Sequence, residues 1–278
     1  MKVLIFGGNG QLGKELRTFI PEAISYSHST IGVEQTADVR SAVLVDKTIS
    51  NNRPDVIINA AAMTNVDKCE EDKISALAVN GYAVNSMVKS ARSIGAFFVQ
   101  VSTDYVFDGI EGNYTEDSLP NPINYYGFSK IIGDIYASSY ENSLIVRTSG
   151  VFGHINNFPK FAFETLKSNK ELKVIDGFYS PIHARMLARS IAELILSRPT
   201  GFLNIAGEKT SRMTMAKKIA QMYGFDEKLI KESELNLTLK AKRPYDSSLV
   251  IEKAKRIISF NFYSQEDGLR LMGASHSI

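Results

Sequence analysis

Two residues of this sequence, a tyrosine and a lysine, are spaced for proton transfer. Tyr126 and Lys130 lie four residues apart in a segment that predicts a helix, so their side chains share one helix face. A free phenol has a pKa of about 10, whereas an acid–base group works best near pH 7, a gap of about 4 kcal/mol. An ammonium group within reach favours the phenolate and narrows this gap. We therefore expect Tyr126 to exchange a proton with a bound molecule.

The tyrosine–lysine pair alone is weak evidence, because many helices carry one, but a second polar group supports it. The apolar run 97–101 predicts a buried strand, and Ser102, Thr103 and Asp104 follow it directly. In open parallel sheets, ligands bind beyond the carboxyl ends of the strands. The alternative is that these three residues only cap a loop.

The start of the chain predicts the strand, turn and helix of a dinucleotide site. Residues 3–6 form an unbroken apolar run, typical of a buried parallel strand, and apolar residues then recur at helical spacing over 12–19. The glycines between them fit a loose form of the dinucleotide fingerprint, which lets backbone N–H groups approach a pyrophosphate. An ordinary glycine-rich turn is the alternative. The residues that we expect to contact the dinucleotide here are Gly7, Asn9, Gly10, Gln11, Leu12 and Gly13.

The end of the second predicted strand, residues 23–27, bears on the choice of dinucleotide. A carboxylate at this point binds the ribose 2′-hydroxyl of NAD and repels a 2′-phosphate. The stretch Ser27-His28-Ser29-Thr30 contains no carboxylate, and no arginine to clamp a phosphate. We therefore expect NADPH, with NADH as the alternative. An ordinary polar loop is an equally good interpretation of this stretch.

Further residues complete the expected cofactor site. Asp38, with Val39 beside it, could accept a hydrogen bond from an adenine amine, or could cap the helix predicted over 41–51. The strand predicted over 54–59 ends in three alanines, which would let a flat cofactor lie on the backbone or would serve tight packing. Asn80 lies at the edge of a long helix pattern and is either a core contact or a cofactor contact. The residues that we assign to the cofactor in this part are Asp38, Val39, Ala60, Ala61, Ala62 and Thr64.

Composition narrows the class of protein. The chain has 278 residues, 44% of them hydrophobic, which is enough to bury a real core. Its formal net charge of +2 is too small to favour nucleic acid as a partner. The single cysteine, Cys69, fits a reducing compartment, and no stretch reaches the roughly 18 apolar residues of a membrane span. We expect a cytoplasmic protein with no membrane contact, no signal peptide and no metal site.

The alternation of strands and helices predicts an α/β fold. We expect a doubly wound parallel sheet of the Rossmann type over 1–150 and a smaller α/β lobe, mainly for substrate binding, over 151–278. Arg243 lies in a predicted loop of that lobe and could bind a diphosphate bidentately, although a surface arginine has equal weight. The elements predicted after residue 140 are strands over 143–148, 172–175 and 201–206 and helices over 161–166, 184–196 and 213–222.

These motifs together resemble those of the extended short-chain dehydrogenases/reductases, and most of all the dTDP-4-dehydrorhamnose reductase family. The resemblance extends over nearly the whole chain. It implies that NADPH reduces the 4-keto group of dTDP-4-dehydrorhamnose to give dTDP-L-rhamnose. The matching segments are the Gly7–Gly13 turn, 59–67 (NAAAMTNVD), 102–107 (STDYVF), the Tyr126-x-x-x-Lys130 pair, Arg147-Thr148-Ser149 and Arg243-Pro244.

The resemblance also implies a role for each residue at the reaction site. Tyr126 donates the proton, and Lys130 lowers the tyrosine pKa and holds the nicotinamide ribose. Thr103 hydrogen-bonds the keto oxygen, and Asp104 orients the sugar. The backbone of Val101 lies beneath the nicotinamide. Arg243 belongs to the substrate site.

One position departs from the family pattern. Reductases of this family commonly carry a tryptophan directly after Arg-Thr-Ser, beside the sugar, but this chain has Gly150 there and no tryptophan at all. Phe152 and Tyr179 are candidates to fill the gap. An unfilled gap would weaken sugar binding.

Three matters stay open at this stage. A nucleotide-sugar epimerase with tightly held NAD is an alternative function. A regulatory subunit such as that of methionine adenosyltransferase, which resembles this reductase family, is another. The sequence does not determine the oligomeric state, and a homodimer is one possibility.

Overall fold

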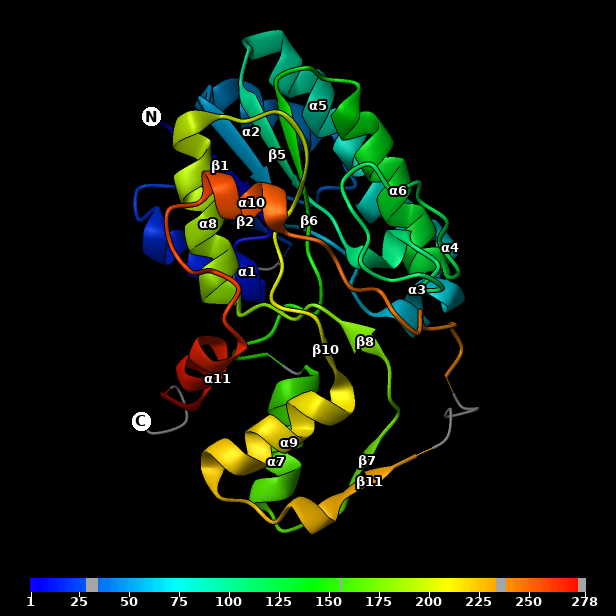
Figure 1. The fold of residues 1–278 in the computed structure, drawn as a ribbon. Helices are drawn as coiled ribbons and strands as arrows, with labels where there is room; N and C mark the ends of the chain where they lie inside the picture. Colours follow the sequence, from blue (N-terminus) through cyan, green and yellow to red (C-terminus); the bar gives the residue numbers. More distant parts are fainter. Residues whose placement is uncertain (29–34, 156, 234–238, 275–278) are drawn as a thin grey trace.

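The computed structural model describes residues 1–28, 35–155, 157–233 and 239–274 and is built on a seven-stranded sheet (Figure 1). Every neighbouring pair in this sheet is parallel, which confirms the predicted doubly wound α/β fold. The strands, in spatial order, are β3 (Gln35–Thr36), β2 (Ile24–Ser27), β1 (Val3–Phe6), β4 (Val56–Asn59), β5 (Phe97–Val101), β6 (Ser143–Arg147) and β9 (Gly201–Asn204).

Both faces of the sheet are covered by helices, which explains why its central strands are continuously apolar. Val3 and Ile5 pack on one face with α1 (Gln11–Phe19), α8 (Ala184–Ser197) and α10 (Glu252–Ile257). The alternate residues Leu4 and Phe6 pack on the opposite face with α2 (Ala42–Asn52), α5 (Ala83–Ile94) and α6 (Tyr125–Ser138). The sheet therefore has two cores, one per face.

The long helix predicted before Gly95 is interrupted. It consists of α4 (Lys73–Leu77), a π-helical turn (Ala78–Tyr82) and α5, and it ends at Gly95 with a left-handed φ of 70°. The shorter α3 (Val66–Glu71) precedes it. Asn80 lies in the π-turn, where its amide exchanges hydrogen bonds with the backbone of Met63 and donates to Ser129. Asn80 is thus a core contact that fixes the loop after β4.

The C-terminal half adds a small lobe with its own core (Figure 1). In this lobe β7 (Leu172–Val174) pairs in parallel with β11 (Ile230–Glu232), and β8 (Phe178–Tyr179) pairs antiparallel with β10 (Thr210–Ser211). The helices that pack around its core are α7 (Phe158–Lys167), α9 (Arg212–Tyr223) and α11 (Gln265–Ala274).

Three elements after residue 150 belong to the sheet layer and not to this lobe. Strand β9 pairs with β6, α8 packs against α1, and α10 packs against β9. The chain therefore passes from the sheet layer into the lobe after β6, returns to the sheet layer for α8 and β9, and then enters the lobe again. Several connections thus join the sheet layer to the lobe. No helix within the described residues is long and apolar enough to cross a membrane.

Candidate active site

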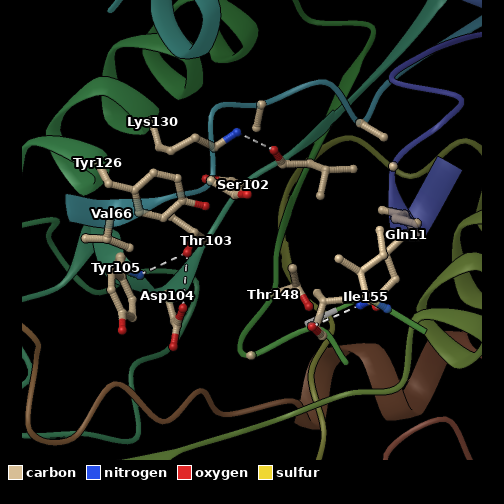
Figure 2. A pocket seen from close by; sticks show the side chains of 18 residues that line it. Gln11, Val66, Ser102, Thr103, Asp104, Tyr105, Tyr126, Lys130, Thr148 and Ile155 are labelled. Carbon is tan, nitrogen blue, oxygen red and sulfur yellow. Dashed lines mark hydrogen bonds between the residues drawn. The ribbon is translucent and has the colours of Figure 1, made fainter. Parts of the chain in front are cut away.

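A pocket of about 440 Å³ lies at the carboxyl ends of the central strands (Figure 2). The three residues assigned to the chemistry from the sequence, Thr103, Tyr126 and Lys130, all line it. They come from the segment after β5 and from α6, so the fold brings together side chains that are up to 27 residues apart. Other predicted site residues in the same lining are Gly10, Gln11, Leu12, Ala60, Ala62, Thr64, Val101 and Asp104.

The start of α6 positions Tyr126. Asn124 caps this helix by accepting a hydrogen bond from the backbone N–H of Gly127 at 2.9 Å. A Cβ at Gly127 would lie 2.0 Å from the carbonyl oxygen of Tyr105, so glycine permits the helix to pack on that backbone. The rings of Tyr105 and Tyr126 then meet edge to face with centroids 5.9 Å apart.

Burial is the main cause of the pKa shift of the Tyr126 phenol. The surrounding protein raises the pKa of Tyr126 above its ordinary value, and a hydrogen bond with Thr103 opposes this shift. The lowering of this pKa by Lys130, which the family resemblance implied, stays a prediction. The Tyr126 side chain is therefore a neutral phenol near pH 7, which is the form that donates a proton.

Lys130 is buried one helical turn further on, with 2% of its surface exposed. Its Nζ donates to the carbonyl oxygen of Val101 at 2.7 Å. Burial lowers the pKa of Lys130, and the charge of Asp134 raises it. Asp134 in turn accepts a hydrogen bond from Ser102 at 2.6 Å. Our sequence analysis missed Asp134, although its place four residues after Lys130 puts it on the same helix face.

Thr103 and Asp104 form a hydrogen-bonded unit in the lining of the pocket. The Thr103 hydroxyl caps a 3₁₀ turn (Asp104–Val106) by accepting from the N–H of Tyr105 at 3.3 Å, and it donates to Asp104 at 3.1 Å (Figure 2). Asp104 also accepts from the hydroxyls of Ser149 and Ser247, both at 2.6 Å. Burial raises the pKa of Asp104, and these three hydroxyls oppose the shift.

A second pocket, of about 540 Å³, continues the first along the glycine turn and shares Gly10, Ala60 and Ala62 with it. The turn is tightly packed: a Cβ at Gly13 would lie 2.1 Å from the oxygen of Gly7. Gly7 has a φ of +88°, and a Cβ there would meet the backbone of Ala60 at 2.6 Å. Only glycines fit these two positions, and the N-terminus of α1, which has no side-chain cap at Gly10, follows the turn directly. The residues of the two pockets therefore fit a dinucleotide.

The far end of the second pocket contains an arginine that the stretch 27–30 lacks. We found no arginine in the stretch after β2, yet Arg40 lines this pocket together with Ser27 and His28. Arg40 pairs with Asp38 at 2.6 Å, and this hydrogen bond lowers the pKa of Asp38 to about 2. Val39 and Ala61 line the same pocket. Ser29 and Thr30 lie outside the described residues.

Gln11 has a contact that the sequence could not reveal. Its side-chain amide donates to the carbonyl oxygen of Val151 at 3.1 Å and accepts from the N–H of Ile155 at 2.9 Å. The side chain thus ties the glycine turn to the segment after β6. Asn9, by contrast, lies in the turn but outside the lining of both pockets.

On the other side of the reaction pocket, the lobe contributes two more cavities. One of about 440 Å³ is lined by the segment 239–245, including Arg243, and by Arg212 of α9. A small one of about 140 Å³ shares Arg212 with it and shares Asp104, Tyr105 and Gly150 with the reaction pocket. The guanidinium of Arg243 pairs with Asp67 at 2.9 Å. Our sequence analysis did not select Arg212, because this residue belongs to none of the recognised sequence motifs.

Comparison with known proteins agrees with this arrangement. A family model described as the RmlD substrate binding domain matches residues 1–277. The dTDP-4-dehydrorhamnose reductase of Escherichia coli (strain K12) is 32% identical over 290 residues, which cover 98% of this chain and 97% of that protein. The chain belongs to the dTDP-4-dehydrorhamnose reductase family.

Solved structures of this reductase family share the fold. The crystal structure of a hypothetical dTDP-4-dehydrorhamnose reductase from Sulfolobus tokodaii is 43% identical, with a TM-score of 0.91 over 96% of this chain and 99% of that chain. A dTDP-4-dehydrorhamnose reductase from Bacillus anthracis str. Ames, solved in complex with NADP, is 28% identical, with a TM-score of 0.87 over 99% of this chain and 100% of that chain.

The missing tryptophan of the reductase family has a structural counterpart in Tyr179. A Cβ at Gly150 would lie 2.7 Å from a ring carbon of Tyr179, and Gly150 has a φ of +48°. The tyrosine ring therefore covers the glycine, and a larger side chain at 150 would collide with it. Phe152, the other candidate, is fully buried in the lobe core with no part in either pocket beside Gly150. Of the two candidates, Tyr179 is therefore the one whose ring lies against Gly150.

Proposed function

We propose that this chain reduces the 4-keto group of dTDP-4-dehydrorhamnose to give dTDP-L-rhamnose, with NADPH as the reductant. The observation that carries the proposal is the position of Tyr126, Lys130 and Thr103 in one pocket. That pocket continues into the glycine-turn pocket on one side and into the cavities of the lobe on the other. The glycine-turn pocket suits the dinucleotide, the middle pocket suits the reacting ketone, and the lobe cavities suit the nucleotide of the substrate.

The residues that would hold the cofactor are the backbone of the glycine turn, the alanines after β4 and, at the far end, Asp38 and Val39. When bound, NADPH supplies the hydride for C4 of the sugar. Arg40 places a cationic group, and His28 an imidazole, near the end of β2, where a 2′-phosphate would be accepted. We therefore propose that NADPH binds at least as well as NADH.

The chain's own residues supply the proton. Tyr126 donates its phenolic proton to the keto oxygen, and the O–H bond of the product forms as the O–H bond of the phenol breaks. Lys130 carries a positive charge close to the pocket, which stabilises the tyrosinate that remains and can hold the ribose hydroxyls of the cofactor. Thr103 places a hydroxyl beside the developing alkoxide.

The substrate would extend from this point into the lobe. The ring of Tyr179 forms an apolar wall beside the sugar, and Arg212 and Arg243 are the cations available to the diphosphate. A cytoplasmic location and a homodimer are further parts of the proposal. The single cysteine supports the first.

A turnover assay tests the proposal. Purified protein would be incubated with NADPH or NADH and a panel of 4-keto nucleotide sugars, and cofactor oxidation would be followed by absorbance. We expect the fastest oxidation with dTDP-4-dehydrorhamnose and NADPH. An epimerase would interconvert sugars without net NADPH oxidation, and a folded protein that oxidises NADPH with no sugar of the panel would overturn the proposal.

A further inference from the structure

We propose that Asn124 is a positioning residue that couples the segment 239–251, which we call the strap, to the helix that carries Tyr126. A nucleotide bound in the cavity that the strap lines then helps to hold the proton donor in place. This inference rests on the proposed function in one respect only, because it places the nucleotide of the substrate in that cavity. Asn124 itself lines neither the reaction pocket nor the lobe cavity, so it acts on the reaction through other residues.

The side-chain amide of Asn124 is bonded at both ends. Its Oδ1 accepts from the N–H of Gly127 at 2.9 Å and so caps α6, while its Nδ2 donates to the carbonyl oxygen of Lys242 at 3.0 Å. The side chain is buried, with 6% of its surface exposed. The cap needs an acceptor and the strap carbonyl needs a donor, and an amide supplies both. Aspartate or serine also caps helices well, so the cap alone does not require asparagine.

The same part of the strap is bound to helix α3, beside which it passes in Figure 1. The carboxylate of Asp67 accepts from the backbone N–H of Ala241 and from the guanidinium of Arg243, both at 2.9 Å. The strap residue between these two is the one that Asn124 binds. Three successive residues, 241–243, are therefore attached either to α3 or to the cap of α6.

Helix α3 also binds the start of α6. The carboxylate of Glu70 accepts from the backbone N–H of Tyr125 at 2.7 Å. The N–H groups on both sides of Tyr126, those of Tyr125 and Gly127, are thus bonded to Glu70 and to Asn124. Both acceptors belong to the region that holds the strap, so the placement of the tyrosine and the placement of the strap depend on neighbouring contacts.

The strap residues that make these contacts also line the lobe cavity of about 440 Å³. Lys242 belongs to this lining while its carbonyl oxygen is bound by Asn124. A ligand that orders the strap from the cavity therefore also orders the acceptor of the Asn124 amide, and through it the first turn of α6. Binding energy gained at a remote part of the substrate can in this way favour the reaction at the ketone.

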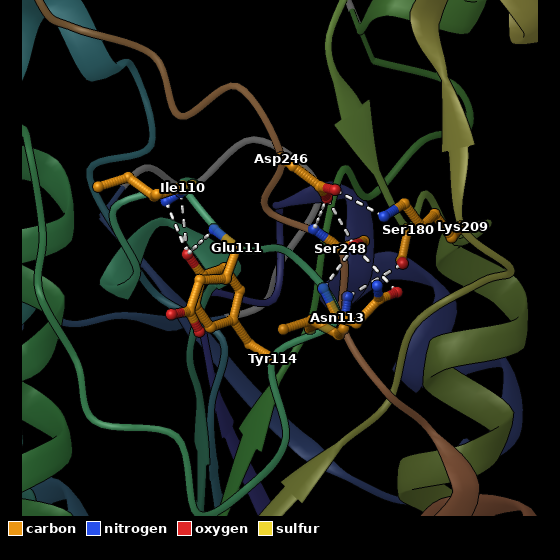
Figure 3. Close-up of polar contacts among 10 residues, drawn as sticks. Ile110, Glu111, Asn113, Tyr114, Ser180, Lys209, Asp246 and Ser248 are labelled. Carbon is orange, nitrogen blue, oxygen red and sulfur yellow. Dashed lines mark hydrogen bonds and ion pairs between the residues drawn. The ribbon is translucent and has the colours of Figure 1, made fainter.

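The second half of the strap provides a matched control, because it is held at a different place (Figure 3). The hydroxyl of Ser248 accepts from the N–H of Asn113 at 2.8 Å and donates to Asp246 at 2.6 Å. Asp246 also pairs with Lys209 at 2.5 Å. Ser248→Ala therefore removes buried polar contacts of the strap, as the loss of the Asn124 amide does, but not at the start of α6.

Two variants separate the helix cap from the coupling. Asn124→Asp and Asn124→Ser keep an acceptor for the cap but lose the donor to Lys242, so their thermal midpoints should lie close to that of Ser248→Ala. We expect kcat for the nucleotide sugar to fall at least about fivefold in both, because the tyrosine is less often in place. The sugar KM should not rise, since nucleotide binding no longer orders the helix. Ser248→Ala should keep kcat within about twofold of the wild type.

Hydrogen exchange measures the coupling without turnover. In the wild type, dTDP should slow the exchange of the backbone N–H groups of residues 125–128 at least about threefold, measured by mass spectrometry. In Asn124→Asp and Asn124→Ser, dTDP should still bind, as calorimetry would show, but should leave this exchange unchanged. Ser248→Ala should respond to dTDP as the wild type does. Should one of the two Asn124 variants fail to fold, the other gives the same comparison.

The outcomes for this inference and for the proposed function can be told apart. Equal protection by dTDP in the wild type and in the Asn124 variants would overturn the inference, and so would a raised sugar KM with kcat retained. A wild type in which the exchange of residues 125–128 does not respond to dTDP would overturn it as well, whatever its turnover. A protein that shows the protection but reduces no sugar would instead overturn the proposed function and leave the coupling in place.

Discussion

At Tyr126, burial raises the pKa of the phenol, while the ammonium of the neighbouring lysine is bonded to the backbone. The acceptor of this Lys130 bond is the carbonyl oxygen of Val101. For a reduction this is a suitable resting state, because the tyrosine must begin with its proton. The lysine charge then becomes useful after the proton has left, when a tyrosinate remains.

Replacement of Tyr126 by phenylalanine should remove the proton donor and little else. We expect the Tyr126→Phe variant to lose at least about a hundredfold in kcat, the usual scale for an acid–base group. The affinity for NADPH, measured by calorimetry, should stay close to that of the wild type. Near-normal turnover in this variant would remove Tyr126 from the reaction.

The wall formed by Tyr179 gives a second prediction at this scale. Tyr179→Ala should raise the KM for the sugar by a factor that corresponds to about 1–3 kcal/mol, because it removes one apolar wall. Tyr179→Phe should keep the KM, since the phenolic oxygen is buried and has no hydrogen-bond partner within the described residues. Equal KM values for all three proteins would show that the sugar does not reach this ring.

At the scale of the elements, helix α8 begins at a buried histidine. The Nδ1 atom of His183 caps the helix by accepting from the N–H of Arg185 at 3.1 Å. Burial, with smaller contributions from the charges of His154 and Arg185, lowers the pKa of His183 to about 4 from an ordinary 6.5. The helix therefore starts correctly only while this imidazole is neutral.

This shift predicts a loss of stability in acid. Between about pH 6.5 and pH 4 the unfolded chain binds a proton that folded His183 refuses, so the free energy of unfolding falls as the pH falls, by at most about 1.4 kcal/mol per pH unit. Chemical denaturation of the wild type and of His183→Asn at several pH values would measure this slope. Asparagine can also cap a helix but does not titrate, so its slope should be smaller. Equal slopes would contradict the assignment.

The end of β2 makes a prediction about cofactor choice. Because no carboxylate follows β2 directly in the sequence, and the carboxylate of Asp38 in the same pocket is paired with Arg40, NADPH should bind at least as well as NADH. Ser27→Asp adds a charge that repels a 2′-phosphate and should shift the preference toward NADH. Calorimetric titration of both cofactors at equal salt gives the ratio, and a clearly tighter NADH complex of the wild type would contradict the prediction.

At the scale of the whole molecule, local patterns predicted the elements better than they predicted the contacts between them. The apolar runs at β1, β4 and β5 and the glycine at 95 specify strands and a helix end by short-range rules, and the structure confirms them. The polar residues after β5 could be placed because the ends of parallel strands meet at one edge of the sheet.

Contacts over long sequence distances lay beyond such rules. Asp104 meets hydroxyls that are 45 and 143 residues away, and no local pattern encodes such a separation. The same holds for Tyr179 over Gly150 and for Arg40 near the end of β2, which depend on tertiary packing. The strand β9 was predicted, but its return to the sheet follows from pairing with the free edge of β6, which its own sequence does not specify.

The most direct test of the account is the destination of the hydride. Wild-type protein would be incubated with dTDP-4-dehydrorhamnose and NADPH that carries deuterium at both positions of nicotinamide C4, and the product would be examined by mass spectrometry and NMR. The account predicts one deuterium in each product molecule, bound to C4 of the sugar, with one NADPH consumed. A product without deuterium at C4, or a sugar converted with no consumption of NADPH, would contradict it.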